Sequence, residues 1–394
     1  MGEAIEKAAP LIVHLVYRLD FGGLENLMVE RINRLPVGAY RHAVVALTES
    51  SDFAKKISRP DVVVHELHKQ PGASLGTHVD LYRLLRKLKP AVLHSYNLAG
   101  VEYAPIAMLA GVPVRINGAH GRDASDPDGT NPKHRLLRRL MIPFHDCMYG
   151  NSADLVAWNR NFIGVPAAKS RLLGNGIDSD KFHPAGIKGD VPGFGPDCIV
   201  IGTVGRIQDV KDHAGLMDAF IALRALLPQQ AARLRLAIVG DGPLLPALRA
   251  KAAAAGIDAA VWLPGARTDI ADILRSLDIF CMSSLAEGTP GSALEAMATS
   301  LPVVGTRVGG LPEVIDDGVT GTLVPPADPP AMAAALARYV AAPELAAQHG
   351  AAGRERILNR YNMPAMVAAY KSMYDTLCDR KTNLGKHVKP CVES

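Results

Sequence analysis

Two glutamates in the second half of the sequence carry the clearest chemical signal. The segment from Glu287 to Glu295 contains Gly288 and Gly291, which predict a loop after a strand, and a helix is predicted from about Ser292. A helix N-terminus attracts phosphate, and carboxylates beside it can accept hydrogen bonds from sugar hydroxyls. An alternative stays open, because Ser292 and Glu295 also have the spacing of a capping box, in which Glu295 would only satisfy backbone N–H groups.

Two cations follow the predicted strand 199–204. Arg206 and Lys211 lie in the segment Val-Gly-Arg-Ile-Gln-Asp-Val-Lys, and a helix is predicted from about Asp212. Arginine offers a bidentate fork of N–H groups and lysine a point charge, so the pair suits a diphosphate. The alternative is a solvated loop with two ordinary surface charges.

Glycine-rich turns and a histidine follow other predicted strands. Gly22 and Gly23 follow the first strand, where backbone N–H groups can approach an anion closely, although a plain tight turn has the same pattern. His120 follows the predicted strand 114–117 and has Gly118 and Gly121 beside it. Arg122 and Asp123 come next and would orient His120 or bind an acceptor. Gly240 ends another predicted strand, and Arg267 lies after the one that follows.

The elements that must position these residues alternate between strands and helices. Strands are predicted at 11–17, 42–47, 62–67, 91–94, 114–117, 147–149, 171–173, 199–204, 234–239, 261–263, 279–282, 302–304 and 321–324. Such alternation is typical of α/β folds with parallel sheets and helices on both faces. We therefore predict two Rossmann-like, doubly wound domains facing across a cleft, with ligands at the carboxyl ends of the strands.

Composition places a boundary between the two predicted domains. Residues 183–197 contain three prolines and four glycines without periodicity, which predicts a linker. The predicted organisation is a first Rossmann-like domain over 1–185 and a second over 186–360, and the resemblance described below implies that the first is the acceptor side and the second binds a nucleotide sugar. A C-terminal helix over 361–378 is expected to cross back to the first domain, and a basic tail follows over 379–394.

The order of these motifs resembles family 4 of the retaining glycosyltransferases, which have the GT-B fold. The resemblance runs from about residue 11 to residue 377. It implies that Glu287 binds the donor sugar, that Glu295 binds the nucleotide ribose and that Arg206 and Lys211 hold the diphosphate. It also implies that His120 contacts the sugar near the reacting carbon and that the donor-binding residues include Gly22, Gly23, Gly240, Arg267, Gly288 and Gly291.

The first domain also resembles sugar transferases associated with PEP-CTERM and exopolysaccharide loci. The segments from Tyr17 to Asn26, from Leu67 to Gly72 and from His120 to Asp123 carry this likeness. The chain departs from that pattern after Glu287 and after His94, so the donor sugar is left open. A metal-independent hexosyltransferase is expected, with no cofactor beyond the nucleotide diphosphate sugar itself.

Bulk composition limits the classes of partner that the chain is expected to bind. The chain has 394 residues and a net charge of +4, which is too weak to indicate nucleic acid. Five cysteines without metal-ligand spacing suggest free thiols in the cytoplasm. The stretch 133–141 has four Lys or Arg and no acidic residue. It would bind an anionic membrane at the inner face of the plasma membrane, as suits a glycan or lipid-linked acceptor, or it is a solvated helix face.

Other functions compete with glycosyl transfer. A nucleotide-sugar epimerase of the same architecture would need no acceptor, and a non-catalytic protein would only bind the nucleotide sugar. A nicotinamide-dependent oxidoreductase needs a GxGxxG turn after a first strand, and the turns at Gly22 and Gly205 do not have it.

Overall fold

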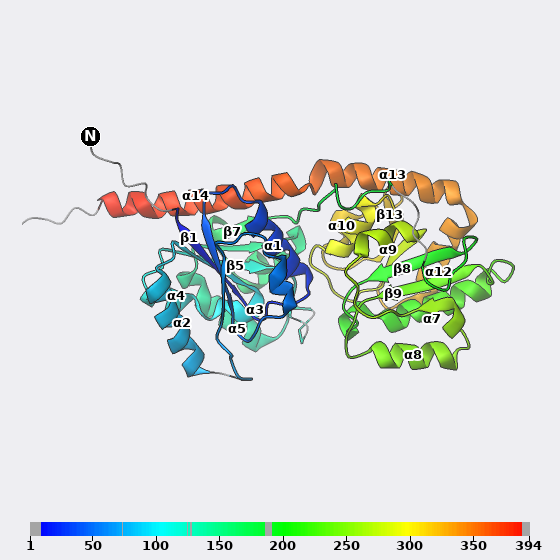
Figure 1. The fold of residues 1–394 in the computed structure, drawn as a ribbon, viewed down its shortest axis with the longest axis horizontal. Coiled ribbons are helices and arrows are strands. Elements are labelled where there is room, and N and C mark those ends of the chain that lie inside the picture. The colour runs from blue at the N-terminus through cyan, green and yellow to red at the C-terminus, as the bar shows by residue number, and fades with distance from the viewer. Residues whose placement is uncertain (1–8, 73, 124, 127, 186–190, 388–394) are drawn as a thin grey trace, which may run out of the picture. The chain divides into compact units, whose positions relative to one another are not determined.

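The chain forms two compact units. The computed structural model describes residues 9–72, 74–123, 125–126, 128–185 and 191–387. The first unit comprises Met1–Gly174 and Pro364–Ser394, and the second comprises Asn175–Met363. Each unit contains one parallel sheet with helices packed on both faces, so the predicted doubly wound α/β fold is confirmed in both (Figure 1).

The boundary between the units lies earlier than the predicted linker. It falls after Gly174, because the following segment belongs to the core of the second unit. Ile177 and Phe182 are buried there among apolar side chains. The backbone N–H of Ile177 also donates to the carbonyl of Tyr361 at 2.7 Å. The predicted boundary at 185/186 is therefore wrong, and residues 186–190 of the predicted linker lie outside the described residues.

The first sheet has seven parallel strands in the order β3-β2-β1-β4-β5-β6-β7. They are β1 Leu11–Val16, β2 Arg41–Ala46, β3 Val63–Glu66, β4 Val92–Tyr96, β5 Val114–Ala119, β6 Cys147–Gly150 and β7 Ser170–Leu172. The helices are α1 Gly23–Arg34, α2 Leu75–Leu88, α3 Asn97–Val101, α4 Ala104–Leu109, α5 Pro132–Met141, α6 Ala153–Trp158 and α14 Met363–His387, with short turns η1 Asp52–Lys56, η2 Ile142–Phe144, η3 Asn159–Ile163 and η4 Ala167–Lys169.

Successive strand residues of the first sheet point to opposite faces. Val13 and Leu15 pack with Leu81 of α2 on one face. Val16 packs with Met28 of α1 on the other face. The second face is also the one on which the C-terminal helix α14 packs. This helix continues to His387, so the described part of the predicted tail, 379–387, is helical, and residues 388–394 lie outside the described residues.

The second sheet has six parallel strands in the order β10-β9-β8-β11-β12-β13. They are β8 Ile199–Val204, β9 Leu234–Val239, β10 Val261–Trp262, β11 Ile279–Met282, β12 Val303–Thr306 and β13 Gly321–Val324. The helices are α7 His213–Leu226, α8 Leu245–Ala254, α9 Ile270–Ser276, α10 Gly291–Ala298, α11 Leu311–Val314, α12 Pro329–Ala341 and α13 Pro343–Arg360, with short turns η5 Asp209–Lys211 and η6 Asp258–Ala260.

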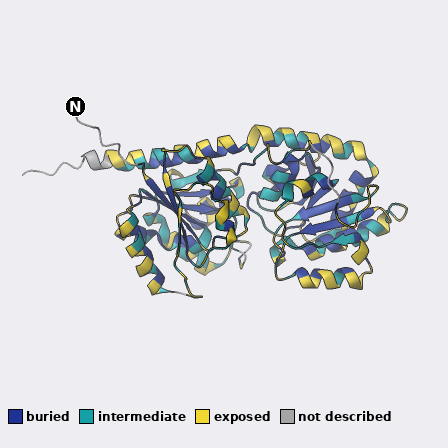
Figure 2. Cartoon of the chain, viewed as in Figure 1, coloured by how far each residue is buried: buried dark blue, intermediate teal, exposed yellow. Residues whose placement is uncertain are grey.

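Two apolar layers enclose the second sheet. Ile201 and Leu236 pack with Phe220 of α7 on one face. Phe280 and Met297 pack together on the other face. The central strands of both sheets are accordingly buried, the edge strands β3, β7 and β10 are partly exposed, and the outer faces of the helices are exposed (Figure 2). This rigid packing leaves the loops after the strands as the places where polar side chains can reach a ligand.

Candidate functional site

The strand order of the second sheet reverses between β8 and β11. A doubly wound sheet opens a crevice at such a point, outside the carboxyl ends of its strands. The loop after β8 carries Lys211 and the loop after β11 carries Glu287. Lys211 Nζ lies 2.5 Å from Glu287 Oε1. The two residues that the sequence assigned to separate motifs therefore meet at the point where the topology predicts a ligand.

Two hydrogen bonds to backbone carbonyls hold these loops together. Ser283 Oγ donates to the carbonyl of Lys211 at 2.8 Å, and the N–H of Leu285 donates to the carbonyl of Val210 at 2.8 Å. Ser284 Oγ donates to Glu287 Oε1 at 2.6 Å. Only 9% of the Glu287 side chain is exposed. Its carboxylate thus has a fixed position before any ligand arrives.

Two glycines permit close approaches that a side chain would block. Gly309 has a φ of +49°, and a Cβ there would lie 1.9 Å from the carbonyl oxygen of Glu287. Gly240 has a φ of +149°, and a Cβ there would lie 1.9 Å from the carbonyl oxygen of Gly205. The N–H of Gly240 donates to the carbonyl of Gly265. The loops that carry Arg206, Gly240 and Arg267 are therefore neighbours along one edge of the sheet.

The two arginines of this edge differ in their partners. Arg206 is exposed, and within the described ranges its side chain makes no hydrogen bond or ion pair. Arg267 holds Asp269 through two bonds, Nε to Oδ1 at 2.9 Å and Nη2 to Oδ2 at 2.6 Å. These bonds keep the pKa of Asp269 below its ordinary value. Arg206 is thus available to an anion, whereas Arg267 would have to leave Asp269.

The helix that carries Glu295 begins one residue earlier than predicted. Its N-cap is Pro290 and its first residue is Gly291. Ser292 lies inside the first turn and is not the N-cap, and the N-cap residue makes no side-chain cap hydrogen bond. The capping-box alternative for Ser292 and Glu295 is therefore wrong. Gly288 lies in the preceding loop. A Cβ built at Gly291 would meet nothing within 4 Å, which indicates open space beside the start of α10.

In the first unit, Gly22 and Gly23 lie at the start of α1. Gly22 is the N-cap, with an extended φ of −164°. A Cβ at Gly22 would lie 2.1 Å from Glu25 Oε2, whereas one at Gly23 would meet nothing within 4 Å. The carboxylate of Glu25 therefore covers part of this helix start. An anionic ligand at the start of α1 would have to displace it.

His120 directly follows β5, and both its backbone and its ring are held. Its N–H donates to Asn97 Oδ1 at 2.8 Å, and its Nε2 lies 2.9 Å from the hydroxyl of Tyr149. Burial, followed by the nearby charge of Arg31, lowers the pKa of His120 to about 3. The imidazole is thus neutral at physiological pH. At that pH it cannot serve as a general acid in its imidazolium form.

The two residues suggested as partners of His120 are engaged elsewhere. Arg122 Nη2 lies 2.8 Å from Asp154 Oδ2. Asp123 accepts hydrogen bonds from the N–H and the hydroxyl of Ser125. The suggestion that Arg122 or Asp123 orients His120 is therefore wrong. Tyr149 and Asn97 orient it, through hydrogen bonds to its ring and to its backbone.

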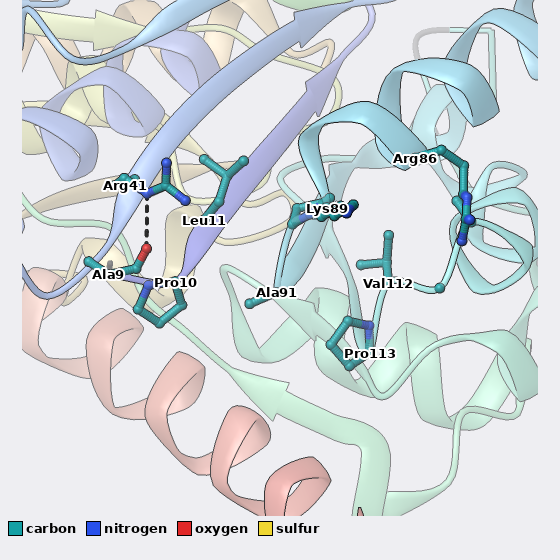
Figure 3. Close-up of a pocket in the computed structure, with 12 residues that line it drawn as sticks. Ala9, Pro10, Leu11, Arg41, Arg86, Lys89, Ala91, Val112 and Pro113 are labelled. Atoms are coloured by element: carbon teal, nitrogen blue, oxygen red, sulfur yellow. Dashed lines mark hydrogen bonds between the residues drawn. The ribbon is translucent and has the colours of Figure 1, made fainter. Parts of the chain in front are cut away.

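A cavity of the first unit lies at the opposite end of the strands. It has a volume of about 470 Å³, and Figure 3 shows Arg41, Arg86 and Lys89 around it. Pro10 and Val112 place it at the amino ends of β1 and β5. His120 follows the carboxyl end of β5, so this cavity is separate from the predicted site residues.

The described part of the chain has neither a metal-binding cluster nor a helix that could span a membrane. No group of three His, Cys, Asp or Glu side chains there is placed to hold a metal ion. Among the described helices, none combines the length and the apolar character needed to cross a bilayer. The four described cysteines, Cys147, Cys198, Cys281 and Cys378, are not in disulfides.

Some residues that shape these sites carry little signal in the sequence. Ser284 lies three residues before Glu287, at the end of β11, so its position relative to the strand could have indicated it. Asn175 Nδ2 donates to the carbonyl of Thr289, within the Glu287 to Glu295 segment, at 2.8 Å. Tyr149 reaches His120 from β6 and Asn97 from the start of α3, directly after β4, and only the sheet order brings them there.

Comparison with known families covers most of the chain. Residues 21–181 match the family described as Glycosyltransferase Family 4, and residues 198–342 match Glycosyl transferases group 1. The likeness to PEP-CTERM transferases has no counterpart in these matches.

Several curated relatives are similar to this chain. A D-inositol 3-phosphate glycosyltransferase from Geodermatophilus obscurus is 30% identical over 89% of this chain and 85% of its own length. The glycosyltransferase EpsF of Bacillus subtilis (strain 168) is 34% identical, and the match covers 50% of this chain and only 52% of EpsF. The Escherichia coli UDP-Gal:alpha-D-GlcNAc-diphosphoundecaprenol alpha-1,3-galactosyltransferase is 27% identical, over 75% and 78% of the two chains.

The fold is also similar to solved structures. Anabaena HepE, solved in complex with UDP and glucose, superposes with a TM-score of 0.79 and is 17% identical, covering 93% of this chain and all of HepE. This likeness confirms the two-domain GT-B fold that the sequence predicted.

Proposed function

Because the chain belongs to the glycosyltransferases, with a family 4 domain followed by a group 1 domain, we propose that it transfers a hexose-type sugar from a nucleotide diphosphate sugar to a glycan or lipid-linked acceptor. The observation that carries the proposal is the Lys211–Glu287 pair at the β8/β11 switch point. Lys211 offers a cation that can bind a phosphate, and Glu287 beside it offers a carboxylate that can accept hydrogen bonds from sugar hydroxyls.

The resemblance and the geometry support specific roles. In this proposal Arg206 and Lys211 hold the diphosphate, Glu287 binds the sugar hydroxyls and Glu295 binds the ribose. The exposed position of Arg206 and the open space at Gly291 favour these roles. The remaining donor-binding assignments are Gly22, Gly23, Gly240, Arg267 and Gly288, and His120 is assigned contact with the sugar near the reacting carbon.

We further propose that the transfer retains the anomeric configuration without a metal. The chain's cations would stabilise the departing diphosphate, and the diphosphate would help to take the acceptor proton in a front-face displacement. Lys211 and Arg206 supply the positive charge that such a leaving group needs. Excess EDTA should therefore leave turnover unchanged, and a strict requirement for Mn²⁺ would contradict this assignment.

The cellular setting is proposed from the relatives and the surface. The Escherichia coli relative is named for a diphosphoundecaprenol acceptor, which supports a lipid-linked acceptor here. We propose a role in exopolysaccharide synthesis, in the manner of PEP-CTERM loci, at the inner face of the plasma membrane. The exposed leucines Leu136 and Leu140 of α5 and the exposed Phe162 nearby support contact with a membrane.

Donor binding tests the core of the proposal. Isotherms with UDP-, GDP- and ADP-sugars should identify one tight donor, and Arg206→Ala or Lys211→Ala should each weaken it by about 10-fold or more, since each removes a charge-assisted hydrogen bond. Lys251→Ala is the matched control, because Lys251 pairs with Asp218 on the surface of the same unit. Equal binding by all three variants would refute the assignment.

Turnover separates the competing functions. An epimerase would convert the donor when it is incubated alone, whereas a glycosyltransferase needs an acceptor. A binding protein would show an isotherm but no product. ¹H NMR of the product would report the anomeric configuration, and inversion would contradict the retaining mechanism.

A further inference from the structure

The cavity at the amino ends of the strands of the first sheet is lined by three cations. Its volume of about 470 Å³ lies within the range of about 300–1,000 Å³ that is typical of small-molecule sites. The cations are Arg41, Arg86 and Lys89, and the lining contains no Asp or Glu (Figure 3). The six residues of β5 separate this end of the sheet from His120 by roughly 20 Å, at about 3.3 Å per residue. We call this cavity the basic cavity.

The rest of the lining is mainly apolar. It includes the buried side chains of Leu11 and Val112. Backbone N–H groups of the lining are already engaged, since that of Arg41 donates to the carbonyl of Pro10 at 3.0 Å and that of Ala91 to the carbonyl of Leu11 at 2.9 Å. A ligand in the basic cavity would therefore be held by the three charged side chains.

Arg41, the first residue of β2, has a fixed guanidinium group. Its Nε donates to the carbonyl of Ala9 at 3.0 Å, the bond drawn in Figure 3. Within the described ranges, neither of its Nη atoms has a hydrogen bond or an ion pair. The bond at Nε thus holds the group in place and leaves two nitrogen atoms that can donate to an anion.

Arg86 and Lys89 come from the C-terminal end of α2. A Cβ at Gly111 would lie 3.9 Å from Arg86 Nη1, which places this guanidinium group beside Gly111. Among the described residues, neither Arg86 nor Lys89 has a carboxylate partner, whereas Arg83 of the same helix pairs with Asp80 at 3.7 Å. Both cations are exposed, so a ligand can reach them from solvent.

Lys89 occupies a backbone conformation that favours glycine. It is the C-cap of α2, with a φ of 49° and a ψ of 55°, and its N–H donates to the carbonyl of Leu85 at 2.8 Å. Glycine is the usual left-handed residue at a helix end, because a side chain there brings Cβ close to the following carbonyl oxygen. What lysine adds at this position is a cation beside the basic cavity. A strained residue of this kind is a reason to look for a function.

We propose that the basic cavity binds an anion that carries a phosphate group and more than one negative charge. The three cations of the lining repel one another in the absence of a carboxylate, and a multivalent anion would neutralise them. Arginine binds phosphate oxygens through paired N–H groups, and lysine supplies a point charge. The proposal does not depend on the proposed function, because it uses side chains of the first unit that have no part in donor binding.

Calorimetric titration with inorganic diphosphate tests the site in the full-length protein. The background is Arg206→Ala/Lys211→Ala, so that the proposed donor site does not contribute. This protein should still bind diphosphate, and added salt should weaken the binding because it screens exposed charges. Adding Arg41→Ala or Arg86→Ala should raise the Kd by about 10-fold or more, since each removes charge-assisted hydrogen bonds. Absence of binding in the background protein would overturn the proposal.

Lys89→Gly separates the charge from the fold. In the same background it should leave the thermal midpoint unchanged or raise it, because glycine relieves the left-handed conformation, and it should weaken diphosphate binding by about 10-fold. The matched control is Lys87→Ala, which removes an exposed cation of the last turn of α2 that does not line the cavity. Equal affinities of Lys89→Gly and Lys87→Ala would also overturn the proposal, since both variants fold.

A soluble phosphate ester and a phospholipid headgroup share this chemistry, and two further probes separate them. Glycerol 3-phosphate should displace diphosphate if the ligand is a soluble ester. Vesicles of phosphatidylcholine with phosphatidic acid should sediment the wild type if the ligand is a headgroup. Lys89→Gly should then abolish the sedimentation, and Lys87→Ala should retain it. If neither probe shows binding that depends on Lys89, the basic cavity is not a site for phosphate-bearing ligands.

Discussion

At the scale of single residues, the Lys211–Glu287 ion pair affects both the unliganded protein and the proposed binding of the donor. The two charges neutralise each other, and the side chains are 23% and 9% exposed. In the proposed function, a diphosphate that binds Lys211 would compete with Glu287, whose carboxylate would then be free to bind the sugar. Without a donor, the ion pair supplies the partly buried carboxylate with its opposite charge.

Gly291 offers a test of where the donor lies. Gly291→Ala adds a methyl group to the first turn of α10, where nothing lies within 4 Å. The thermal midpoint should stay the same or rise, since alanine favours helix by about 0.4–1 kcal/mol over glycine. Donor affinity measured by calorimetry should nevertheless fall, because the methyl group occupies the ligand's space.

Gly76→Ala provides the matched control for Gly291→Ala. Gly76 lies in the first turn of α2, where a Cβ would make only an ordinary contact at 3.7 Å. This variant should bind the donor as the wild type does. Undiminished donor affinity in Gly291→Ala would place the donor away from the start of α10.

At the scale of elements, α5 forms over the basic amphipathic stretch predicted at 133–141, but one of its four cations is in the core. Arg138 is buried 5.1 Å from the ring centre of Trp158, and Arg139 donates to the carbonyls of Phe162 and Ile163. Burial lowers the pKa of Arg138 to about 10. The exposed face presents Leu136 and Leu140, each more than half exposed, together with Lys133 and Arg139. Arg138 thus belongs to the fold rather than to a membrane-binding surface.

The exposed leucines of α5 can be tested with vesicles. Replacing Leu136 and Leu140 with serine should abolish co-sedimentation with vesicles that contain anionic lipid, because the loss removes the apolar area that enters the interface. The double control Leu226→Ser/Leu358→Ser changes two exposed leucines of the second unit. If all proteins sediment alike, α5 is a solvated helix face.

At the scale of the whole molecule, the two units should differ in their response to acid. Five buried histidines of the first unit have pKa values lowered mainly by burial: His14, His42, His94, His120 and His145. In the second unit, burial lowers the pKa of His213 to about 4 and more weakly lowers that of His349. The first unit therefore contains more imidazoles that must stay neutral to remain folded.

The sign of the effect follows from proton binding. Below pH 6.5 the unfolded histidines take up protons, while the folded ones stay neutral down to their lowered pKa values, so stability is lost as the pH falls below 6.5. Each such histidine reduces the free energy of unfolding by about 2 kcal/mol at pH 5. The first unit should lose more stability than the second between pH 7 and pH 5.

The two tryptophans permit this measurement, because Trp158 lies in the first unit and Trp262 in the second. Urea unfolding of Trp262→Phe would report the first unit, and that of Trp158→Phe the second. A larger acid shift of the Trp262 signal than of the Trp158 signal would contradict the prediction.

The sequence by itself determined the strands and the order of the motifs. All thirteen predicted strands are present, with ends that differ by a few residues, and the turns with glycine, Arg206, Lys211 and Glu287 follow them as expected. These features depend on neighbours along the chain, such as β-branched runs, helical periodicity and glycines, so local patterns are sufficient. The likeness to family 4 arose from the same order.

Only the tertiary structure decided which side chains meet. His94 and Tyr374 are 280 residues apart in sequence, and their contact depends on α14 packing on the first sheet. The burial of Arg138 and the early unit boundary after Gly174 likewise depend on packing. Pairing and burial are set by strand order and register, which bring together residues that have no relation along the chain.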